Sequence, residues 1–282
     1  MVPARCPGSV ALSISLLLAP SIGNARAQAR AELLRQALGT ALGEDTDIQM
    51  AASYDELTLR ALESSADLIW APPSLCARLE GAARAMFRCV RRGRGTYRSA
   101  IVVRRGEVKT LGGLVGKRAS WVDPLSLGGH LLAVDYLRGE GYLPSQTFTE
   151  QEFAGSYPAA LANVVNGHAD VTAVTVPDGA ETSVAESIER YGGALHAERL
   201  ASIAVTGETP NDALVFSHSL DEDRTAELIE RVFGTQESPK TPSALCLALE
   251  ADGFEAADPS DYRPVKRLLQ NGTRLTEFPP SL

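Results

Sequence analysis

The segment Gly116–Leu132 most constrains how this chain can fold, because it contains a strand, a tight turn and a helix start in one run. Residues 118–122 have the composition of a strand, and Asp123 and Pro124 end it. Ser126 is a favourable N-cap residue, and the glycine pair that follows lets the backbone approach a bound group closely. Because a helix N-terminus presents unpaired N–H groups and a positive dipole end, the segment predicts a cradle for an anion or a polar ligand. The same residues also fit an ordinary capped helix after a strand.

Composition limits the classes of protein that fit. At 282 residues the chain is long enough for two lobes, and its 44% hydrophobic and 22% charged residues are typical of a globular protein. The net charge of −8 argues against nucleic-acid binding, because only the stretch from Arg84 to Arg105 is locally basic, and we expect that stretch to form a solvated edge. The four cysteines and four histidines have no metal-ligand spacing, so neither a metal nor a cofactor is expected. Cys76 and Cys89 could form a disulfide if the protein is exported.

The first thirty residues support two interpretations. Arg5, the apolar run 10–18 and the later 25–27 imitate the parts of a secretory signal. Val10 to Leu16 also alternates apolar and small polar residues as a strand does, before a loop and a helix over 25–42. We favour the strand, because an α/β sheet needs its first strand near the centre. The protein is periplasmic if it is exported, and the strand interpretation leaves a cytoplasmic location open. No stretch reaches the ~20 apolar residues that a membrane-spanning helix needs.

Strand and helix patterns alternate along the rest of the chain, which predicts an α/β fold. Residues 66–71 form a short apolar strand that stops at two prolines, where a turn and a helix start follow. Because ligands in open α/β sheets bind outside the carboxyl ends of the strands, Trp70 to Ser74 is expected to form a wall of a site, with Trp70, Ala71 and Pro72 as its binding residues. The rhythm of strand, turn, helix and strand repeats over 115–176 and indicates a compact parallel lobe.

Five segments, in this order, resemble the solute-binding proteins of ABC transporters for phosphonate and phosphite, a family of type II periplasmic binding proteins. They are Tyr54–Leu57 with Ala66–Pro72, Tyr97–Arg104, Gly116–Leu131, Gly155–Leu161 with Asn166–Asp170, and Pro210–Val215. The resemblance covers most of the chain and implies a two-lobed α/β fold with two crossing hinge strands and a ligand cleft between the lobes. It implies lobe 1 at residues 1–98 and 205–282, and lobe 2 at residues 99–204. The crossings are expected near Ser99 to Arg104 and near Ile203 to Asp212.

The chain departs from this family within the implied site. The family's helix start has the form Asp-Pro-Ser-Ser-Thr-Ser-Gly, whereas Leu127 and Gly128 here carry no hydroxyl and only Ser126 keeps a side-chain donor. Tyr157 stands where a histidine is common, and Thr175 near where an acidic residue that pairs with a ligand's amine is common. A phosphonate dianion loses much stabilisation without such donors, so we expect a less charged, partly apolar ligand such as a small organic acid. The residues expected to bind it are Trp70, Ala71, Pro72, Ser126, Leu127, Gly128, Gly129, Tyr157 and Thr175.

The function expected from these observations is non-catalytic binding. A monomer would close at its hinge on a small molecule and pass it to the permease of an ABC transporter. The alternatives are an enzyme on the same fold and a cytoplasmic ligand-sensing module. Catalysis would need an activated acid, base or nucleophile, and the candidates are Asp123, Asp212, Tyr157, His130 and Cys76. None of them stands in a recognisable pair, so no catalytic residue is assigned.

Overall fold

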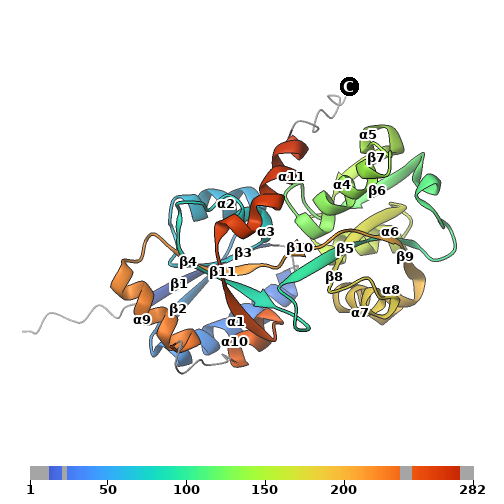
Figure 1. The fold of residues 1–282 in the computed structure, drawn as a ribbon. Coiled ribbons are helices and arrows are strands. Elements are labelled where there is room, and N and C mark those ends of the chain that lie inside the picture. Colours follow the sequence, from blue (N-terminus) through green and yellow to red (C-terminus); the bar gives the residue numbers. More distant parts are fainter. Residues whose placement is uncertain (1–12, 21–23, 236–242, 274–282) are drawn as a thin grey trace, which may run out of the picture.

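Two lobes, each built on one β-sheet, make up the protein (Figure 1). The structure is a computed structural model that describes residues 13–20, 24–235 and 243–273. Within these residues the strands form two six-stranded sheets, and each sheet has an apolar core on both of its faces. The α/β class and the two-lobed architecture are therefore as the sequence predicts.

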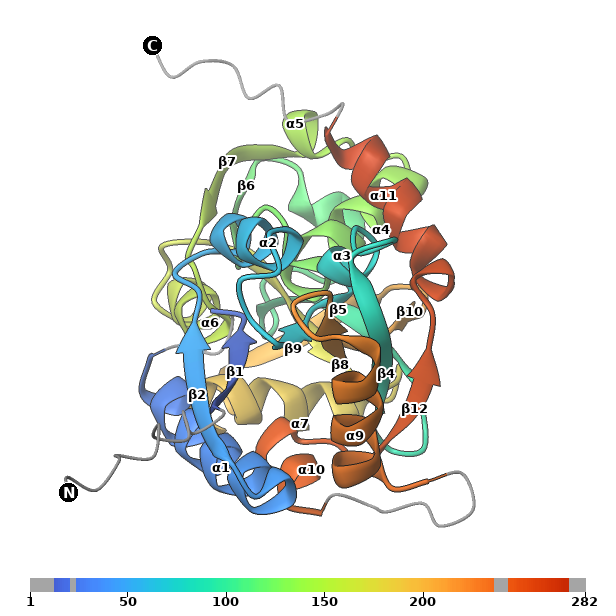
Figure 2. The same ribbon diagram turned by 90° about the vertical axis from the view of Figure 1, so that its left-hand side faces the viewer.

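The first lobe is built on the sheet with strand order β12-β4-β11-β3-β1-β2. Its strands are β1 (Ser13–Leu18), β2 (Asp45–Met50), β3 (Leu68–Ala71), β4 (Ala83–Val90), β11 (Ala213–Ser217) and β12 (Gly253–Ala257). Strands β1, β2 and β3 are parallel, whereas β11 is antiparallel to β3 and β4. Helices α1 (Asn24–Leu42), α9 (Glu222–Phe233) and α10 (Ser243–Leu249) cover one face. Helices α2 (Tyr54–Leu62), α3 (Pro73–Cys76), η3 (Pro259–Tyr262) and α11 (Arg263–Thr273) lie on the other face (Figure 2).

The second lobe is built on the sheet with strand order β10-β5-β8-β6-β7, with β9 also paired to β5. Its strands are β5 (Thr96–Arg104), β6 (Lys117–Trp121), β7 (Phe148–Phe153), β8 (Val171–Val176), β9 (Leu200–Val205) and β10 (Thr209–Pro210). Its helices are η1 (Leu111–Leu114), η2 (Leu127–Leu131), α4 (Leu132–Gly139), α5 (Pro144–Thr147), α6 (Tyr157–Val165), α7 (Glu181–Gly192) and α8 (Ala194–Arg199). In the described parts of the chain, no helix combines the length and the apolar character that crossing a membrane requires.

The strand β1 forms because its side chains alternate between the two cores of the first lobe. Ile14, Leu16 and Leu18 pack into one core, and Leu17 packs into the other. The strand lies between β2 and β3 and pairs in parallel with both. The strand interpretation of the amino terminus is confirmed for residues 13–16, and residues 10–12 lie outside the described residues.

The chain passes between the lobes at two connections. It leaves the first sheet after Val90 and enters the second at Thr96, and it returns over 211–212, between β10 and β11. The return falls within the range expected from the sequence. The outward passage lies upstream of the expected Ser99 to Arg104, because those residues pair with β8 and β9 inside the second sheet. The lobe boundaries 1–98 with 205–282, and 99–204, stay a prediction about which residues move together.

The disulfide considered for Cys76 and Cys89 is absent, and both thiols are free and buried. Cys76 belongs to the core on the face of α2 and α3, whereas Cys89 belongs to the core on the opposite face of the first sheet. Because the sheet lies between the two side chains, their sulfur atoms cannot meet without moving the backbone.

Replacing Leu16 by alanine should lower the free energy of unfolding by about 2–5 kcal/mol, because this side chain of β1 is fully buried and its truncation leaves a cavity. Urea unfolding followed by circular dichroism measures the change. Leu59→Ala on α2 is the control, since the Leu59 side chain is 57% exposed and should cost little. Equal effects of the two substitutions would contradict a place for β1 inside the sheet.

Candidate functional site

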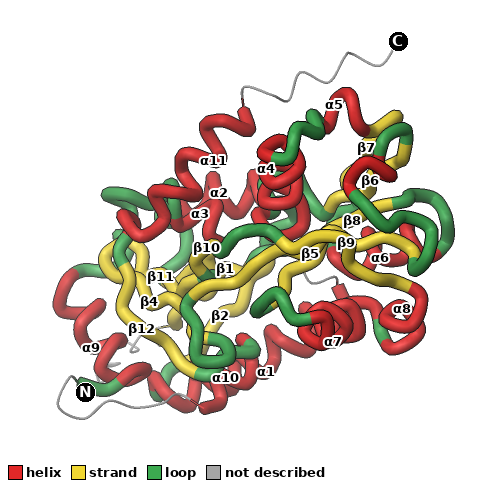
Figure 3. The backbone as a smooth tube through the Cα atoms, turned by 45° about the vertical axis from the view of Figure 1, so that its right-hand side comes forward, coloured by secondary structure: helices red, strands yellow, loops and turns green. Residues whose placement is uncertain are grey.

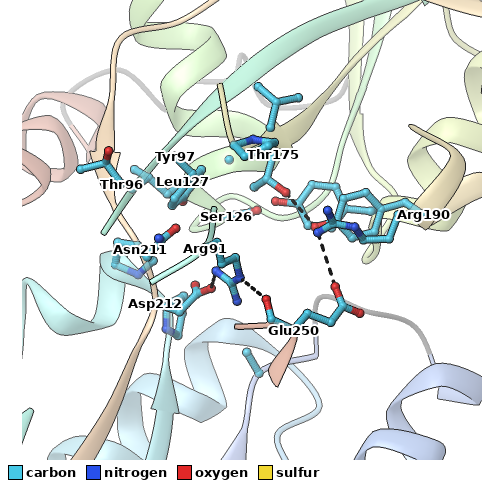
Figure 4. A pocket seen from close by; sticks show the side chains of 18 of the residues that line it. Arg91, Thr96, Tyr97, Ser126, Leu127, Thr175, Arg190, Asn211, Asp212 and Glu250 are labelled. Carbon is cyan, nitrogen blue, oxygen red and sulfur yellow. Dashed lines mark hydrogen bonds and ion pairs between the residues drawn. The ribbon is translucent and has the colours of Figure 1, made fainter. Parts of the chain in front are cut away.

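A cavity of about 470 Å³ lies between the two lobes, where β3 and β8 end (Figure 4). The first lobe and its connections line it with Ala19, Arg30, Tyr54, Trp70, Pro72, Pro73, Arg91, Arg92, Asn211, Asp212, Glu250 and Asp252. The second lobe lines it with Thr96, Tyr97, Ser126, Leu127, Gly128, Tyr157, Thr175, Val176, Pro177, Arg190 and Tyr191. Both lobes therefore contribute to a single site.

Three helices with a serine N-cap begin at the wall of this cavity. Helix α2 comes from the first lobe, and η2 and α6 come from the second; their first residues are Tyr54, Leu127 and Tyr157. The hydroxyl of Ser126 caps η2 by accepting a hydrogen bond from the backbone N–H of Gly129 at 3.2 Å. Ser53 and Ser156 cap α2 and α6 in the same way. The remaining N–H groups of the first turns and the aligned dipoles favour a negatively charged or oxygen-rich ligand between them.

Gly128 allows the second-lobe wall to close around the start of η2. A Cβ atom on Gly128 would lie 2.2 Å from the Cγ2 atom of Thr175 and 3.0 Å from the hydroxyl of Tyr157. The hydroxyl of Ser99 holds the Gly128 carbonyl in place with a hydrogen bond of 2.6 Å. A serine at position 128 would therefore collide with Thr175. The space that a hydroxyl side chain at position 128 would need is thus filled by the methyl group of Thr175.

Tyrosine hydroxyl groups are among the side-chain donors of the site. Burial, followed by the charge of Asp212, raises the pKa of Tyr97 well above its usual value. Burial also raises the pKa of Tyr157, whose ring stacks on Tyr191 with the ring centres 4.4 Å apart. The Tyr191 hydroxyl is 2.7 Å from the hydroxyl of Thr175. Tyr97 and Tyr157 therefore stay protonated at physiological pH and can donate hydrogen bonds to an anion.

Arg91 lines the first-lobe side of the cavity, and the prediction that the whole basic stretch 84–105 is a solvated edge is wrong at this residue. Its Nη1 atom is 3.1 Å from Oδ2 of Asp212. Its Nε and Nη2 atoms donate to the backbone carbonyls of Glu250 and Leu249 at 2.9 and 3.2 Å. The position of Arg91 directly after β4 is the sequence signal for this role, because residues at strand ends line clefts. Composition alone cannot separate it from the other arginines.

The structure brings most of the predicted site residues together. Those that line the cavity are Trp70, Pro72, Ser126, Leu127, Gly128, Tyr157 and Thr175. Ala71 is fully buried in the core beneath α2 and α3, and it is absent from the lining. Gly129 is also absent from the lining, because it packs against Val122 behind the helix start. Whether any of these residues contacts a ligand stays a prediction.

Sequence reasoning did not assign several lining residues to ligand binding. They are Ala19, Arg30, Tyr54, Arg91, Arg92, Thr96, Tyr97, Val176, Pro177, Arg190, Tyr191, Asn211, Asp212, Glu250 and Asp252, whereas Pro73 belongs to the expected wall 70–74. Tyr54 could have been found, because it starts the helix that the first resembling segment contains. Arg190 and Glu250 carry no such signal, since only the packing of the lobes brings helix α7 toward the end of α10.

Three of the five residues considered for catalysis are held away from the cavity lining in structural roles, whereas Tyr157 and Asp212 line the cavity. His130 is buried, and its Nδ1 atom lies 3.0 Å from the carbonyl oxygen of Pro124. Asp123 accepts a hydrogen bond from the backbone N–H of Leu125. Burial raises the pKa of the Cys76 thiol, which keeps it protonated. Within the described residues, no group of three or more His, Cys, Asp or Glu side chains is arranged to hold a metal ion.

A family model described as the periplasmic substrate-binding protein of phosphonate ABC transporters matches residues 16–262 of this chain. The match covers both lobes and the cavity between them.

Solved structures with the same fold extend the comparison. A binding-protein component of an ABC phosphonate transporter from Pseudomonas aeruginosa superposes with a TM-score of 0.78 at 17% identity, over 94% of this chain and 88% of that one. A Prochlorococcus marinus protein in complex with methylphosphonate gives a TM-score of 0.76 at 18% identity, over 93% and 98% of the two chains. A Xanthomonas citri protein bound to ATP gives a TM-score of 0.73 at 17% identity, over 94% and 99%. These likenesses show the fold.

Gly128→Ala should lower the free energy of unfolding by about 1–3 kcal/mol, because the new methyl group overlaps the Cγ2 atom of Thr175. Thr175→Ser removes that methyl and keeps the hydroxyl beside Tyr191, so the alanine should cost less in a Thr175→Ser background. Urea unfolding of the four proteins forms a double-mutant cycle. Gly139→Ala is the control, since a Cβ there meets no atom within 4 Å. An equal cost of Gly128→Ala in both backgrounds would contradict the proposed contact.

Acid should destabilise the protein through His130. Burial lowers the pKa of His130 to about 4, whereas an unfolded histidine has a pKa of about 6.5. Between these values the unfolded chain binds the additional proton, so the histidine contribution to stability is lost as the pH falls from 6.5 toward 4, by about 3 kcal/mol at pH 4. Urea unfolding at several pH values should show a shallower slope for His130→Gln than for the wild type. His218→Gln, at an exposed site, is the control for the loss of a histidine.

Proposed function

The chain belongs to the family of periplasmic substrate-binding proteins of phosphonate ABC transporters, and we propose that it holds a small anionic organic solute in the cavity between its lobes. The observation that carries this proposal is that three serine-capped helices from the two lobes begin at one cavity, which protonated tyrosine hydroxyls also line. Helix N-termini and neutral hydroxyl donors stabilise an anion without a charged side chain. Binding requires both lobes, so the ligand is enclosed when they close.

The arginines around the cavity add little net positive charge. Arg91 is paired with Asp212, and Arg190 is paired with Glu250. A ligand with one negative charge is therefore better matched than a phosphonate dianion, which needs roughly two. Leu127 and Trp70 add apolar surface for the rest of the molecule. We propose a monoanionic organic acid as the preferred solute.

The size of the cavity supports a ligand that has further organic groups attached to its anionic head group. A volume of about 470 Å³ falls in the range of pockets that bury molecules much larger than the five heavy atoms of methylphosphonate. Among solved structures of this fold, the bound molecules named are methylphosphonate in one protein and ATP in another. The fold therefore accepts anions of very different size, and the lining decides which of them binds.

Hinge bending at the two connections is the proposed mechanism of capture. Residues 91–95 and 211–212 join the lobes, and the cavity lies beside both. Opening there would expose the helix N-termini to solvent, and closing would remove the solute from water. The closed monomer would then present both lobes to the permease of an ABC transporter.

Binding without catalysis is the form of this function that the site supports. Asp212 is engaged by Arg91, and Tyr157 has a raised pKa, which keeps its hydroxyl protonated and so unable to accept a proton as a general base. His130 has its ring nitrogen beside a backbone carbonyl, and it does not line the cavity. None of these groups has the paired arrangement that activates an acid, a base or a nucleophile.

Two measurements test this function. Native mass spectrometry of gently purified protein detects a solute that co-purifies with it. Calorimetric titration with methylphosphonate, phosphite and a panel of small carboxylates then ranks the head groups. We expect one site per chain and tighter binding of monoanionic organic acids. Submicromolar binding of methylphosphonate would contradict the preference for a monoanion, and failure to bind any anion would contradict the proposal itself.

Tyr157→Phe should weaken binding of the tightest anion in that panel by about 1.5–3 kcal/mol, because the substitution removes one hydrogen bond to a charged group and keeps the ring that stacks on Tyr191. Calorimetry measures the change in Kd. Tyr142→Phe is the matched control, since Tyr142 belongs to the same lobe but does not line the cavity. An unchanged Kd for Tyr157→Phe would exclude its hydroxyl as a ligand contact.

A further inference from the structure

One face of helix α7 in the second lobe binds the first lobe beside the cavity. Figures 1 and 3 show α7 on the same side of the molecule as α1 and α10, whereas α11 lies on the opposite side. Ser183, Glu186 and Arg190 of α7 are spaced three and four residues apart, so their side chains share one face of the helix. All three contact residues that belong to the first lobe or to its connection.

These contacts are hydrogen bonds and ion pairs across the cleft. The Nη1 atom of Arg92 donates to the hydroxyl of Ser183 at 3.0 Å, and the same guanidinium pairs with Glu186. One turn further along α7, Nη1 of Arg190 is 3.4 Å from Oε2 of Glu250. The carboxylate of Glu250 also pairs with Arg30 of α1 at 3.0 Å, which fixes it on the first lobe.

The two first-lobe anchors share an uncommon backbone conformation. Arg92 has φ of 53° and Glu250 has φ of 52°, in the left-handed region that glycine adopts most readily. Among the described residues other than glycine, Ser64 alone joins them with a positive φ. Arg92 lies in the tight turn between Arg91 and Arg94, and Glu250 directly follows α10, two places where a left-handed residue reverses the direction of the chain. The side chain of each of these two residues meets α7.

We propose that this face of α7 is a latch that holds the cleft closed and sets how fast a bound solute leaves. The proposal rests on the interlobe closure described above, but it does not depend on which solute binds. The side chains of the Arg92–Glu186 and Arg190–Glu250 pairs are 36–55% exposed, so water and salt can compete for them. By contrast, the side chain of Asp170 is only 13% exposed between Arg104 and Arg118 within the second lobe, as a permanent structural pair would be.

Spin labels at the cleft test the latch without any ligand. The labels are attached to the full-length chain with the substitutions Leu195→Cys in α8 and Leu247→Cys in α10. The two leucines are 73% and 72% exposed, whereas the described natural cysteines are buried. Double electron–electron resonance then measures the distance distribution between the lobes. Glu186→Gln and Arg190→Gln should each raise the open-to-closed ratio about two- to fivefold, the range for an exposed ion pair, and their effects should multiply in the double variant.

Glu189→Gln is the matched control, because it removes a carboxylate from the same helix at an exposed position. It should leave the ratio unchanged. Raising the salt concentration should open the wild type and have less effect on the double variant.

Exchanging the charges with Arg92→Glu and Glu186→Arg should restore closure that Glu186→Arg alone disrupts. Thermal unfolding should stay the same throughout, which separates lost closure from lost folding. Equal distance distributions for Glu186→Gln, Arg190→Gln and Glu189→Gln would overturn the latch, and so would failure of the exchanged pair to close.

Discussion

The relative position of the two lobes depends on hydrogen bonds that join the two connections between the sheets. The backbone N–H of Asn211 donates to the carbonyl of Gly95 at 2.8 Å. The side-chain amide of Asn211 donates to the carbonyls of Cys89 and Arg94 at 3.1 and 3.0 Å. The hydroxyl of Tyr262 donates to the Asn211 carbonyl, which ties the start of α11 to the same point. Because Asn211 is fully buried, losing any one of these partners would leave a polar group without water, so the centre of the hinge is firmly held.

The two sides of the cleft are held by different kinds of interaction. On one side, Val265 and Leu269 of α11 share a single apolar core with Leu131 and Leu132 of the second lobe. On the other side, the contacts between α7 and the first lobe are polar and partly exposed. Apolar burial is insensitive to salt, whereas exposed ion pairs are screened by it. The lobes should therefore separate first on the side of α7 while α11 keeps them together.

Charge balance is the physical basis of the proposed preference for a monoanion. Arg91 and Arg190 line the cavity, and each of them already has a carboxylate partner. The attraction for an anion therefore comes from backbone N–H groups and from neutral hydroxyls, whose strength falls short of a dianion's requirement. Gly128 and Thr175 reduce the number of donors in the same direction, because the methyl group of Thr175 takes the space that a hydroxyl side chain at position 128 would need.

The sequence by itself determined the local elements and much of the site. Alternating apolar residues predict β1, and the run from strand to Ser126-capped helix predicts the wall of the cavity, because periodicity, prolines and caps act over a few residues. The tertiary structure decided which arginines reach the cavity, that Gly128 must accommodate Thr175, and that Arg190 meets Glu250. Gly128 and Thr175 are 47 positions apart in the sequence, and Arg190 and Glu250 are 60 positions apart. No local pattern encodes such contacts, because they form only when the sheets fix the direction of the elements and the distances between them.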